Sequence, residues 1–293
     1  MSLAVFDIGG TYIKYAEMDQ GTIVSQGKVL TPMDDQNHFL SQIQLVLSQL
    51  STHIEGIALS IPGVIDVDKK YIHSGGSLIY NNQTDVKQWE ERLQLPIELE
   101  NDARCAAIAE LSAGNMQGID NGLVLTFGTG IGGGIIIDGK VYKGSHLIGG
   151  EVSIILTKDI HEYHGQAAWG ARCSSVNLIK KIADAKGIDS TDGKEIFQYI
   201  KDGDEESHAI FQEYCYEVVL ELHNIQCLLD PQRICIGGGI SANPIFIEGI
   251  KKTQEVFYQN FPIAFPHAEI YKCYFENDAN LRGAYQHYLE KRG

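Results

Sequence analysis

The most restrictive feature of this sequence is a pattern of three short strands that occurs twice. In the first copy the expected strands cover residues 3–7, 14–18 and 22–29. In the second copy they cover residues 123–127, 135–137 and 141–142. A turn of glycine and threonine follows the first strand of each copy. Two copies indicate a duplicated domain, since a solenoid needs at least three repeats. We therefore expect two related α/β halves, each offering a glycine-rich hairpin to a shared cleft.

The first of these turns carries an acidic residue, two glycines, a hydroxyl and a lysine: Asp7, Gly9, Gly10, Thr11 and Lys14. Glycines let backbone N–H groups approach a polyphosphate closely, and the hydroxyl and ammonium groups add donors. A carboxylate repels phosphate but suits a Mg²⁺ ion that is held through water. From these residues alone, a turn that needs small residues for structural reasons explains the string equally well.

The second turn, Gly128, Thr129 and Gly130, begins a string that matches the GxGxxG pattern of dinucleotide-binding folds. Those folds need a helix directly after the pattern, because the helix N-terminus binds the pyrophosphate. Here residues 133–139 predict a strand and a turn instead. We therefore expect an anion-binding hairpin in which Thr129 supplies a hydroxyl donor.

The composition is that of an ordinary globular protein with an acidic excess. The chain has 293 residues and a formal net charge of −15, which disfavours nucleic acid and anionic membranes as partners. Its six cysteines show no CxxC spacing, so we expect buried thiols in a reducing cytosol and no disulfide framework. The first apolar run ends at Asp7, too short for a signal peptide, and no later run could span a bilayer. These features predict a cytoplasmic protein.

An Asn-Asp pair, Asn101 and Asp102, lies between an expected strand at 97–100 and an expected helix at 103–113. An aspartate at this position is a good helix N-cap, and the residues alone favour that structural role. The alternative is a general base, which takes the proton of a substrate hydroxyl as its oxygen attacks a γ-phosphate. Glu151, after the second hairpin, is in the same way either a ligand for a polyol or a solvated loop carboxylate.

The rest of the chain alternates strands and helices. Further strands are expected over residues 57–61, 233–236 and 268–273. Helical patterns cover residues 39–50, 176–185, 194–200, 207–229 and 279–289, and another helix is expected from residue 244. The domain break is expected in a compact hinge near 115–121. His161 and His164 do not complete an HExxH motif, so we expect them on the surface.

Several ordered motifs make this sequence resemble the ROK sugar kinases. The motifs lie at residues 7–11, 61–66, 100–103, 127–134 and 230–241. The resemblance implies an α/β protein with the actin-like ATPase (ribonuclease H-like) fold, two domains around a cleft. It implies a first domain of residues 1–117 with a C-terminal helix at about 279–293, and a second domain of residues 118–278. Gly238 and Gly239 match the adenosine-side motif of the family.

The resemblance also implies phosphoryl transfer from MgATP to a hexose hydroxyl, usually O6, with Asp102 as the general base. Asn101 and Glu151 would then bind the sugar, and Gly63 and Gly76 belong to the sugar-side loops as weaker candidates. This implied role outweighs the capping role that the residues alone favour for Asp102. The expected partners are ATP, Mg²⁺ and a small sugar, and dimers are common in the family, so a homodimer is expected.

Three departures from the family pattern bear on the substrate. Many members carry a histidine where this chain has Ile154, and a cysteine-rich zinc motif of which only Cys173 remains. A second sugar-binding glutamate is replaced by Gly170. We therefore expect no zinc site and a pocket with room for a substituent on C1 of the sugar, as a β-glucoside would need.

Two other functions remain open for such a sequence. A transcriptional regulator of the same family would carry a DNA-binding domain before the first motif, and the position of Asp7 leaves no room for one. A non-catalytic, sugar-sensing or chaperone-like member would not need Asp102, Thr11 and Thr129, which this chain keeps.

Overall fold

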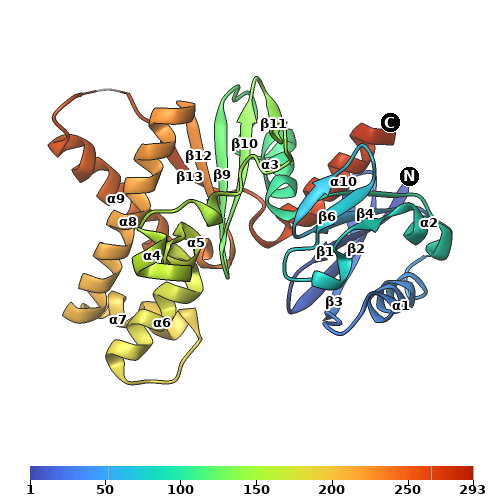
Figure 1. Cartoon of the computed structure of the whole chain (residues 1–293), viewed down its shortest axis with the longest axis horizontal. Helices are drawn as coiled ribbons and strands as arrows, with labels where there is room; N and C mark the ends of the chain where they lie inside the picture. The colour runs from blue at the N-terminus through green and yellow to red at the C-terminus, as the bar shows by residue number, and fades with distance from the viewer. Residues whose placement is uncertain (52, 265, 293) are drawn as a thin grey trace. The chain divides into compact units, whose positions relative to one another are not determined.

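The computed structural model describes residues 1–51, 53–264 and 266–292, which form two compact units (Figure 1). Unit 1 comprises Met1–Gly114, Lys143–Gly149 and Asp278–Gly293. Unit 2 comprises Asn115–Tyr142 and Gly150–Asn277. The domain ranges expected from the sequence do not separate the short segment Lys143–Gly149, which packs with unit 1.

Unit 1 is built on a five-stranded sheet with the order β3-β2-β1-β4-β8. Its strands are β1 (Ser2–Ile8), β2 (Tyr12–Asp19), β3 (Thr22–Leu30), β4 (Ile54–Ile61) and β8 (Ile97–Asn101). The first strand pairs antiparallel with β2 and parallel with β4, so the N-terminal meander is as expected. A small sheet that the sequence did not indicate consists of β5 (Val64–Asp66), β6 (Tyr71–Ser74) and β7 (Thr84–Asp85). The helices of this unit are α1 (Gln36–Leu47), η1 (Ile79–Asn81), α2 (Lys87–Leu93), α3 (Asp102–Ala113) and α10 (Ala279–Arg292).

The central strand β1 is buried on both faces, which explains its unbroken apolar sequence. Phe6 packs with Phe39 of α1 in one cluster, whereas Val5 packs with Leu281 of α10 in another. Alternate residues of a strand point to opposite faces, so one strand serves two cores. At Gly283 an added Cβ would overlap the backbone carbonyl of Cys105, so a glycine is needed for α10 to lie close against α3.

Unit 2 repeats the same topology with the order β11-β10-β9-β12-β13, which confirms the internal repeat (Figure 1). Its strands are β9 (Gly122–Phe127), β10 (Ile131–Ile137), β11 (Lys140–Tyr142), β12 (Arg233–Gly237) and β13 (Glu269–Lys272). Its α-helices are α4 (Ile160–Tyr163), α5 (Trp169–Cys173), α6 (Ser175–Lys186), α7 (Gly193–Lys201), α8 (Glu205–Leu229) and α9 (Pro244–Asn260). The short 3₁₀ helices η2 (Val152–Ile154), η3 (His164–Ala167) and η4 (Gly239–Ala242) also belong to it, and η5 (Glu276–Asp278) lies where the chain passes from unit 2 to unit 1.

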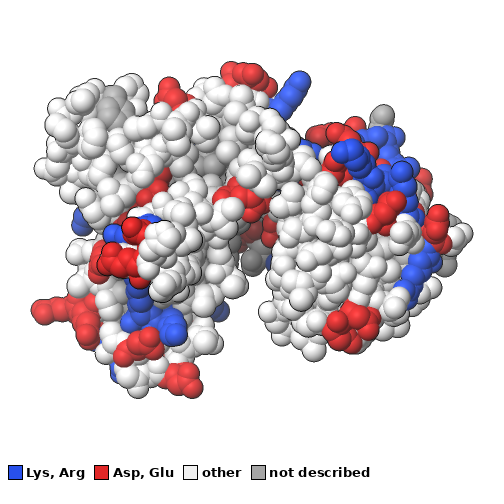
Figure 2. All heavy atoms as spheres, viewed as in Figure 1, with Lys and Arg blue, Asp and Glu red and all other residues white. Residues whose placement is uncertain are grey.

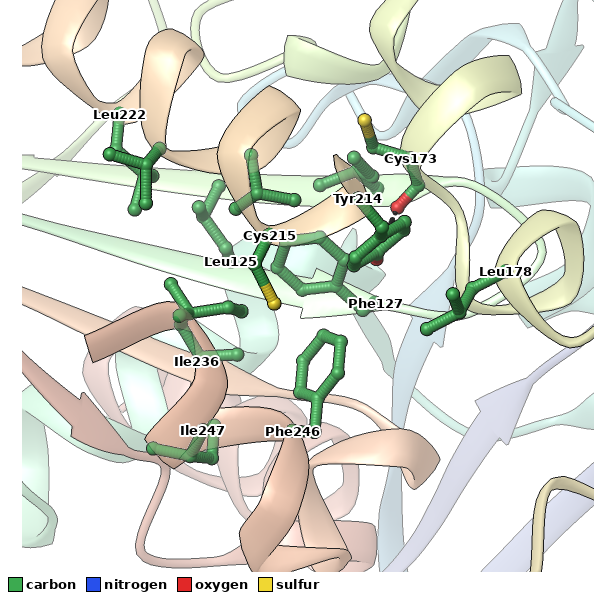
Figure 3. Close-up of a cluster of buried hydrophobic side chains, with 14 of the residues drawn as sticks. Leu125, Phe127, Cys173, Leu178, Tyr214, Cys215, Leu222, Ile236, Phe246 and Ile247 are labelled. Atoms are coloured by element: carbon green, nitrogen blue, oxygen red, sulfur yellow. Dashed lines mark hydrogen bonds between the residues drawn. The ribbon is translucent and has the colours of Figure 1, made fainter. Parts of the chain in front are cut away.

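The core of unit 2 joins the sheet to the helices α8 and α9 (Figure 3). The rings of Phe127 and Phe246 meet edge to face, with their centroids 5.5 Å apart. The hydroxyl of Tyr214 donates to the carbonyl of Cys173 over 2.7 Å, so this buried polar group has a partner. The core therefore fixes the end of β9, from which the second glycine-rich turn projects.

The surface agrees with the acidic composition. On the face seen in Figure 2, acidic and basic side chains are interspersed and large areas are neutral.

Five of the six cysteines are buried, but Cys227 near the end of α8 is exposed, so the expectation of buried thiols is wrong there. The next residue, Leu228, is 82% exposed, so this side of the last turn of α8 faces solvent. No helix among the described residues has the length and apolar character needed to cross a membrane.

Candidate functional site

The first glycine-rich turn joins β1 to β2 in unit 1 and holds a buried carboxylate at its base. Asp7 is 7% exposed, and its Oδ1 accepts hydrogen bonds from Ser60 Oγ (3.1 Å) and Asn280 Nδ2 (2.9 Å). Lys14 Nζ lies 3.6 Å from Asp7 Oδ2. Two neutral donors and one ammonium group therefore fix the orientation of this carboxylate. An anchored carboxylate oxygen fits a Mg²⁺ ion that is bound through water.

The tip of this hairpin is open to solvent. Gly9 N donates to the carbonyl of Tyr12 over 3.0 Å and closes the turn. Gly10 and Thr11 are exposed, and Thr31 Oγ1 donates to the carbonyl of Gly9 over 2.7 Å from the end of the neighbouring strand. The backbone of the turn is thus fixed by hydrogen bonds, while Gly10 and Thr11 at its tip are exposed. Such a turn suits an anionic ligand.

The second turn has the same construction in unit 2. Gly128 N donates to the carbonyl of Gly130 over 2.9 Å, and Thr129 is exposed at the tip. Ser175, at the start of α6, holds the turn because its N and Oγ both donate to the carbonyl of Gly128, over 3.1 and 2.8 Å. A strand, β10, follows the turn, so the exclusion of a dinucleotide-binding fold is confirmed.

The glycine-rich end of β12 lies against the same turn. Gly238 has a φ of +88°, and an added Cβ would overlap the carbonyl oxygen of Phe127. Only glycine suits a position that combines this backbone conformation with such a close approach. Gly239 is exposed directly after it. The two glycine motifs of unit 2 therefore lie at neighbouring strand ends.

Gly239 also lines a cavity of about 760 Å³ within unit 2. The cavity lies between α6, α7 and the start of α9, and its polar lining includes Ser175, Asp192, Lys194, Gln198, Lys201 and Asn243. Its volume is that of a typical small-molecule site, and its lining combines these polar groups with apolar side chains such as Ile179, Phe197 and Ile240. A somewhat larger cavity of about 830 Å³ between α8 and α9 contains none of the expected site residues.

Three of the residues expected on the sugar side gather at the end of β8 in unit 1. Asn101 is the N-cap of α3: its Oδ1 accepts from Arg104 N over 3.2 Å, and its Nδ2 donates to the carbonyl of Gly63 over 3.1 Å. Gly63 has a φ of +111°, and an added Cβ would lie 2.9 Å from the backbone N of Gly76. The structure thus brings Asn101, Gly63 and Gly76 together.

Asp102 does not cap α3, so the capping role that the residues alone favour is wrong. Asn101 occupies the N-cap, and Asp102 is the first residue of the helix. Its Oδ1 accepts from Ala103 N over 2.8 Å, and the side chain is half-buried. The carboxylate therefore lies next to Asn101, at the start of α3, without being required as the cap of the helix.

A buried ionic network ties the segment Lys143–Gly149 to the same end of β8. Glu100 is fully buried, and its Oε2 lies 2.6 Å from Lys143 Nζ. Arg104, 1% exposed, donates from one nitrogen to the carbonyls of Leu147 (2.6 Å) and Gly149 (3.3 Å), and its other terminal nitrogen lies 3.6 Å from Glu100 Oε1. These contacts explain why this segment belongs to unit 1. It ends two residues before Glu151.

Glu151 begins a segment of unit 2 that packs against β10. Gly150 and Gly133 approach so closely that a Cβ on either would overlap the carbonyl oxygen of the other. At Gly170 an added Cβ would overlap the hydroxyl of Ser153. The expectation that this glycine leaves an empty space is therefore wrong, because Ser153 fills that space.

The residues considered for zinc are scattered. His161 and His164 are exposed, as expected. Burial raises the pKa of the Cys173 thiol to about 11, which opposes the thiolate form that zinc requires. Within the part of the chain that the structure describes, no three His, Cys, Asp or Glu side chains are grouped as metal ligands. The absence of zinc stays a prediction.

Among the described residues, sequence reasoning missed several side chains that contact the expected residues: Thr31, Ser60, Asn280, Ser153 and Ser175. No local pattern marks them, because their partners are distant in the chain. Asn280 lies 273 positions from Asp7, and Ser175 lies 47 positions from Gly128.

The chain is similar to known proteins over its whole length. The model of the ROK family matches residues 3–291. The chain is 31% identical to the β-glucoside kinase of Listeria monocytogenes, over 99% of this chain and 98% of that protein. A ROK family protein from Streptococcus pneumoniae, solved with sucrose, has a TM-score of 0.88 and 32% identity, covering 99% of each chain.

A second solved structure extends the comparison. A ROK family glucokinase from Streptomyces griseus, solved with glucose and AMPPNP, has a TM-score of 0.85 and 27% identity over the full length of both chains. The similarity includes both units and both glycine-rich hairpins. This chain therefore belongs to the ROK family, has the actin-like ATPase fold of its sugar kinases, and is a carbohydrate kinase.

Proposed function

We propose that this carbohydrate kinase transfers the γ-phosphoryl group of MgATP to the O6 hydroxyl of a hexose or a β-glucoside, with Asp102 as the general base. The observation that carries the proposal is the division of roles at the start of α3. Asn101 caps the helix and contacts Gly63, so the helix cap does not depend on the neighbouring carboxylate of Asp102, which we propose as the proton acceptor.

In this mechanism Asp102 accepts the proton of the sugar hydroxyl as the hydroxyl oxygen forms a bond to the γ-phosphorus. The bond from that phosphorus to the β–γ bridging oxygen breaks, and ADP leaves with the electron pair. Asn101 and Glu151 orient the sugar, with Gly63 and Gly76 at its loops. Correct positioning supplies most of the rate acceleration in reactions of this class.

The glycine-rich turns are proposed to bind the phosphates. Gly9, Gly10 and Thr11, with Lys14, serve on unit 1, and Gly128, Thr129 and Gly130 serve on unit 2. These groups would stabilise the negative charge of the transferred group. Gly238 and Gly239 are proposed to adjoin the adenosine, which the 760 Å³ cavity beside Gly239 is large enough to hold. Mg²⁺, held near Asp7 through water, would neutralise the charge on the β- and γ-phosphate oxygens.

The first test replaces Asp102 by Asn, which keeps the size and removes the base. We expect kcat to fall by about 100-fold or more, while the Kd values for sugar and nucleotide stay nearly unchanged. Stability should hardly change, because Asn101 supplies the cap. Asp138→Asn, in the exposed turn between β10 and β11, is the matched control for loss of one negative charge. Near-normal turnover in the folded Asp102→Asn protein would refute the assignment.

The second test concerns the acceptor. The relatives named β-glucoside kinase support a β-glucoside acceptor. We expect phosphorylation of cellobiose at its non-reducing 6-hydroxyl, with a kcat/KM at least comparable to that for glucose at the same saturating MgATP. If glucose is phosphorylated and cellobiose is not, the β-glucoside acceptor is rejected, and the assignment as a sugar kinase is unaffected. Sugar binding without turnover of any sugar would instead indicate the sugar-sensing alternative.

A further inference from the structure

The segment that carries Glu151 is held against the second glycine-rich hairpin by one small side chain. The hydroxyl of Ser153 accepts a hydrogen bond from the backbone N of Ile131, over 3.3 Å, at the start of β10. On the hairpin side, an added Cβ at Gly130 would lie 2.9 Å from the same oxygen. Ser153 therefore lies in contact with the hairpin just two residues after Glu151.

The same side chain fills the space beside Gly170 of α5. An added Cβ at Gly170 would overlap the oxygen of Ser153 and would lie 2.9 Å from its Cβ and 3.0 Å from its Cα. Rotating the hydroxyl away would relieve only the first overlap, and it would break the hydrogen bond from Ile131. The contact with Cβ would remain closer than packed atoms allow.

Neither side of this contact can move freely. Trp169 and Cys173, at the two ends of α5, are each 1% exposed. Trp169 N donates to the carbonyl of Ile155 over 2.8 Å, which ties α5 to the segment that contains Ser153. On the other side, Gly150 lies against Gly133 of β10. A side chain at position 170 would therefore strain the contact between α5 and the Glu151 segment, and with it the contact of that segment with the hairpin.

We propose that Ser153 and Gly170 form one size-complementary pair that positions Glu151 and determines acceptor specificity. Ser153 holds the Glu151 segment in place, and it excludes a carboxylate side chain from position 170. The pair thus leaves the sugar with one glutamate ligand from this unit, which suits an acceptor whose C1 oxygen is already substituted. The inference rests on the proposed role of Glu151 as a sugar ligand.

The steric part is tested by a double-mutant cycle on the full-length protein, with Tm as the readout. Gly170→Ala should lower Tm by about 3–10 °C, because it overpacks a tight contact. Ser153→Gly should largely restore Tm in the double variant, and Ser153→Ala should restore less, since its Cβ remains. The matched control is Gly165→Ala in η3, where an added Cβ meets open space. Additive changes in Tm in the double variant, or an unchanged Tm for Gly170→Ala, would overturn the proposal that the two residues act as a pair.

The specificity part uses Gly170→Glu alone and combined with Ser153→Gly. We expect the single variant to lose stability and raise the KM for sugar at least 10-fold, with the KM for ATP within about 3-fold of wild type. The double variant should regain stability. Its ratio of kcat/KM for glucose over that for cellobiose should shift at least 10-fold toward glucose. An unchanged ratio in a stable double variant would overturn the specificity role. Failure of the proposed function itself would appear separately, as full activity of Asp102→Asn.

Discussion

At the scale of single residues, the start of α3 shows how two adjacent polar side chains divide their work. Asn101 uses its carbonyl oxygen to cap the helix and its amide nitrogen to hold the loop at Gly63. An aspartate could accept the first hydrogen bond but could not donate the second. The amide therefore explains why asparagine, and not a second aspartate, precedes Asp102.

This division predicts different outcomes for two substitutions of Asn101. Asn101→Ala should lower the free energy of unfolding by about 1 kcal/mol, because it removes the cap. Asn101→Ser should keep most of that stability, because serine also caps a helix, but lose the hydrogen bond to Gly63. Both should raise the KM for sugar. Urea unfolding and steady-state kinetics measure the two effects, and equal stability of the two variants would contradict the capping role.

At the scale of elements, the network of Glu100, Arg104 and Lys143 fixes a connecting segment on unit 1. Arg104→Leu should lower the free energy of unfolding by about 3–5 kcal/mol, because it leaves Glu100 as a buried charge with a partner removed. Lys87→Leu, at an exposed position, is the control and should change it by less than about 0.5 kcal/mol. Chemical denaturation measures the free energy of unfolding of both variants, and equal small losses would show that the network contributes little to stability.

The C-terminal helix α10 carries a buried histidine, His287. Burial lowers the pKa of His287, with Lys143 and Lys291 acting in the same direction and Glu100 and Glu98 opposing them. The unfolded chain then binds more protons, so this group lowers stability as pH falls below about 6.5, the ordinary histidine pKa.

The prediction is that wild type loses more stability between about pH 7 and pH 5 than His287→Leu does, since the variant cannot gain the proton on unfolding. Denaturant titrations at each pH measure the two slopes. His161→Asn, at an exposed position, is the control for the loss of a histidine. Parallel slopes for wild type and His287→Leu would contradict the role of burial.

At the scale of the whole molecule, each of the two related units carries a glycine-rich hairpin, and the hairpin of unit 1 has a buried carboxylate, Asp7, at its base.

Metal analysis of purified protein should find no stoichiometric zinc, because the buried thiol of Cys173 favours its protonated form. Removing Mg²⁺ should abolish turnover, and adding it back after zinc chelation should restore full activity. Stoichiometric zinc would reveal a site formed by other side chains.

Much of the fold was predictable because its signals are local. The meander at β1–β3, its repeat at β9–β11 and the long helix α8 follow from patterns within a few turns or strands of chain. The small sheet of β5 to β7 was missed, because strands of two to four residues carry too little periodicity to be recognised. The exposure of Cys227 was missed for a related reason, since composition cannot tell which face of a helix meets solvent.

By itself, the sequence determined the duplicated architecture, the two hairpins and, through the order of its motifs, the resemblance to a family. Only the tertiary structure decided which neighbour caps α3, what orients Asp7 and whether Gly170 leaves a space. Those answers depend on contacts such as Asn280 with Asp7, 273 positions apart, and Ser153 with Gly170. Local patterns specify backbone conformation, whereas the environment of a side chain is set by residues that folding brings from elsewhere in the chain.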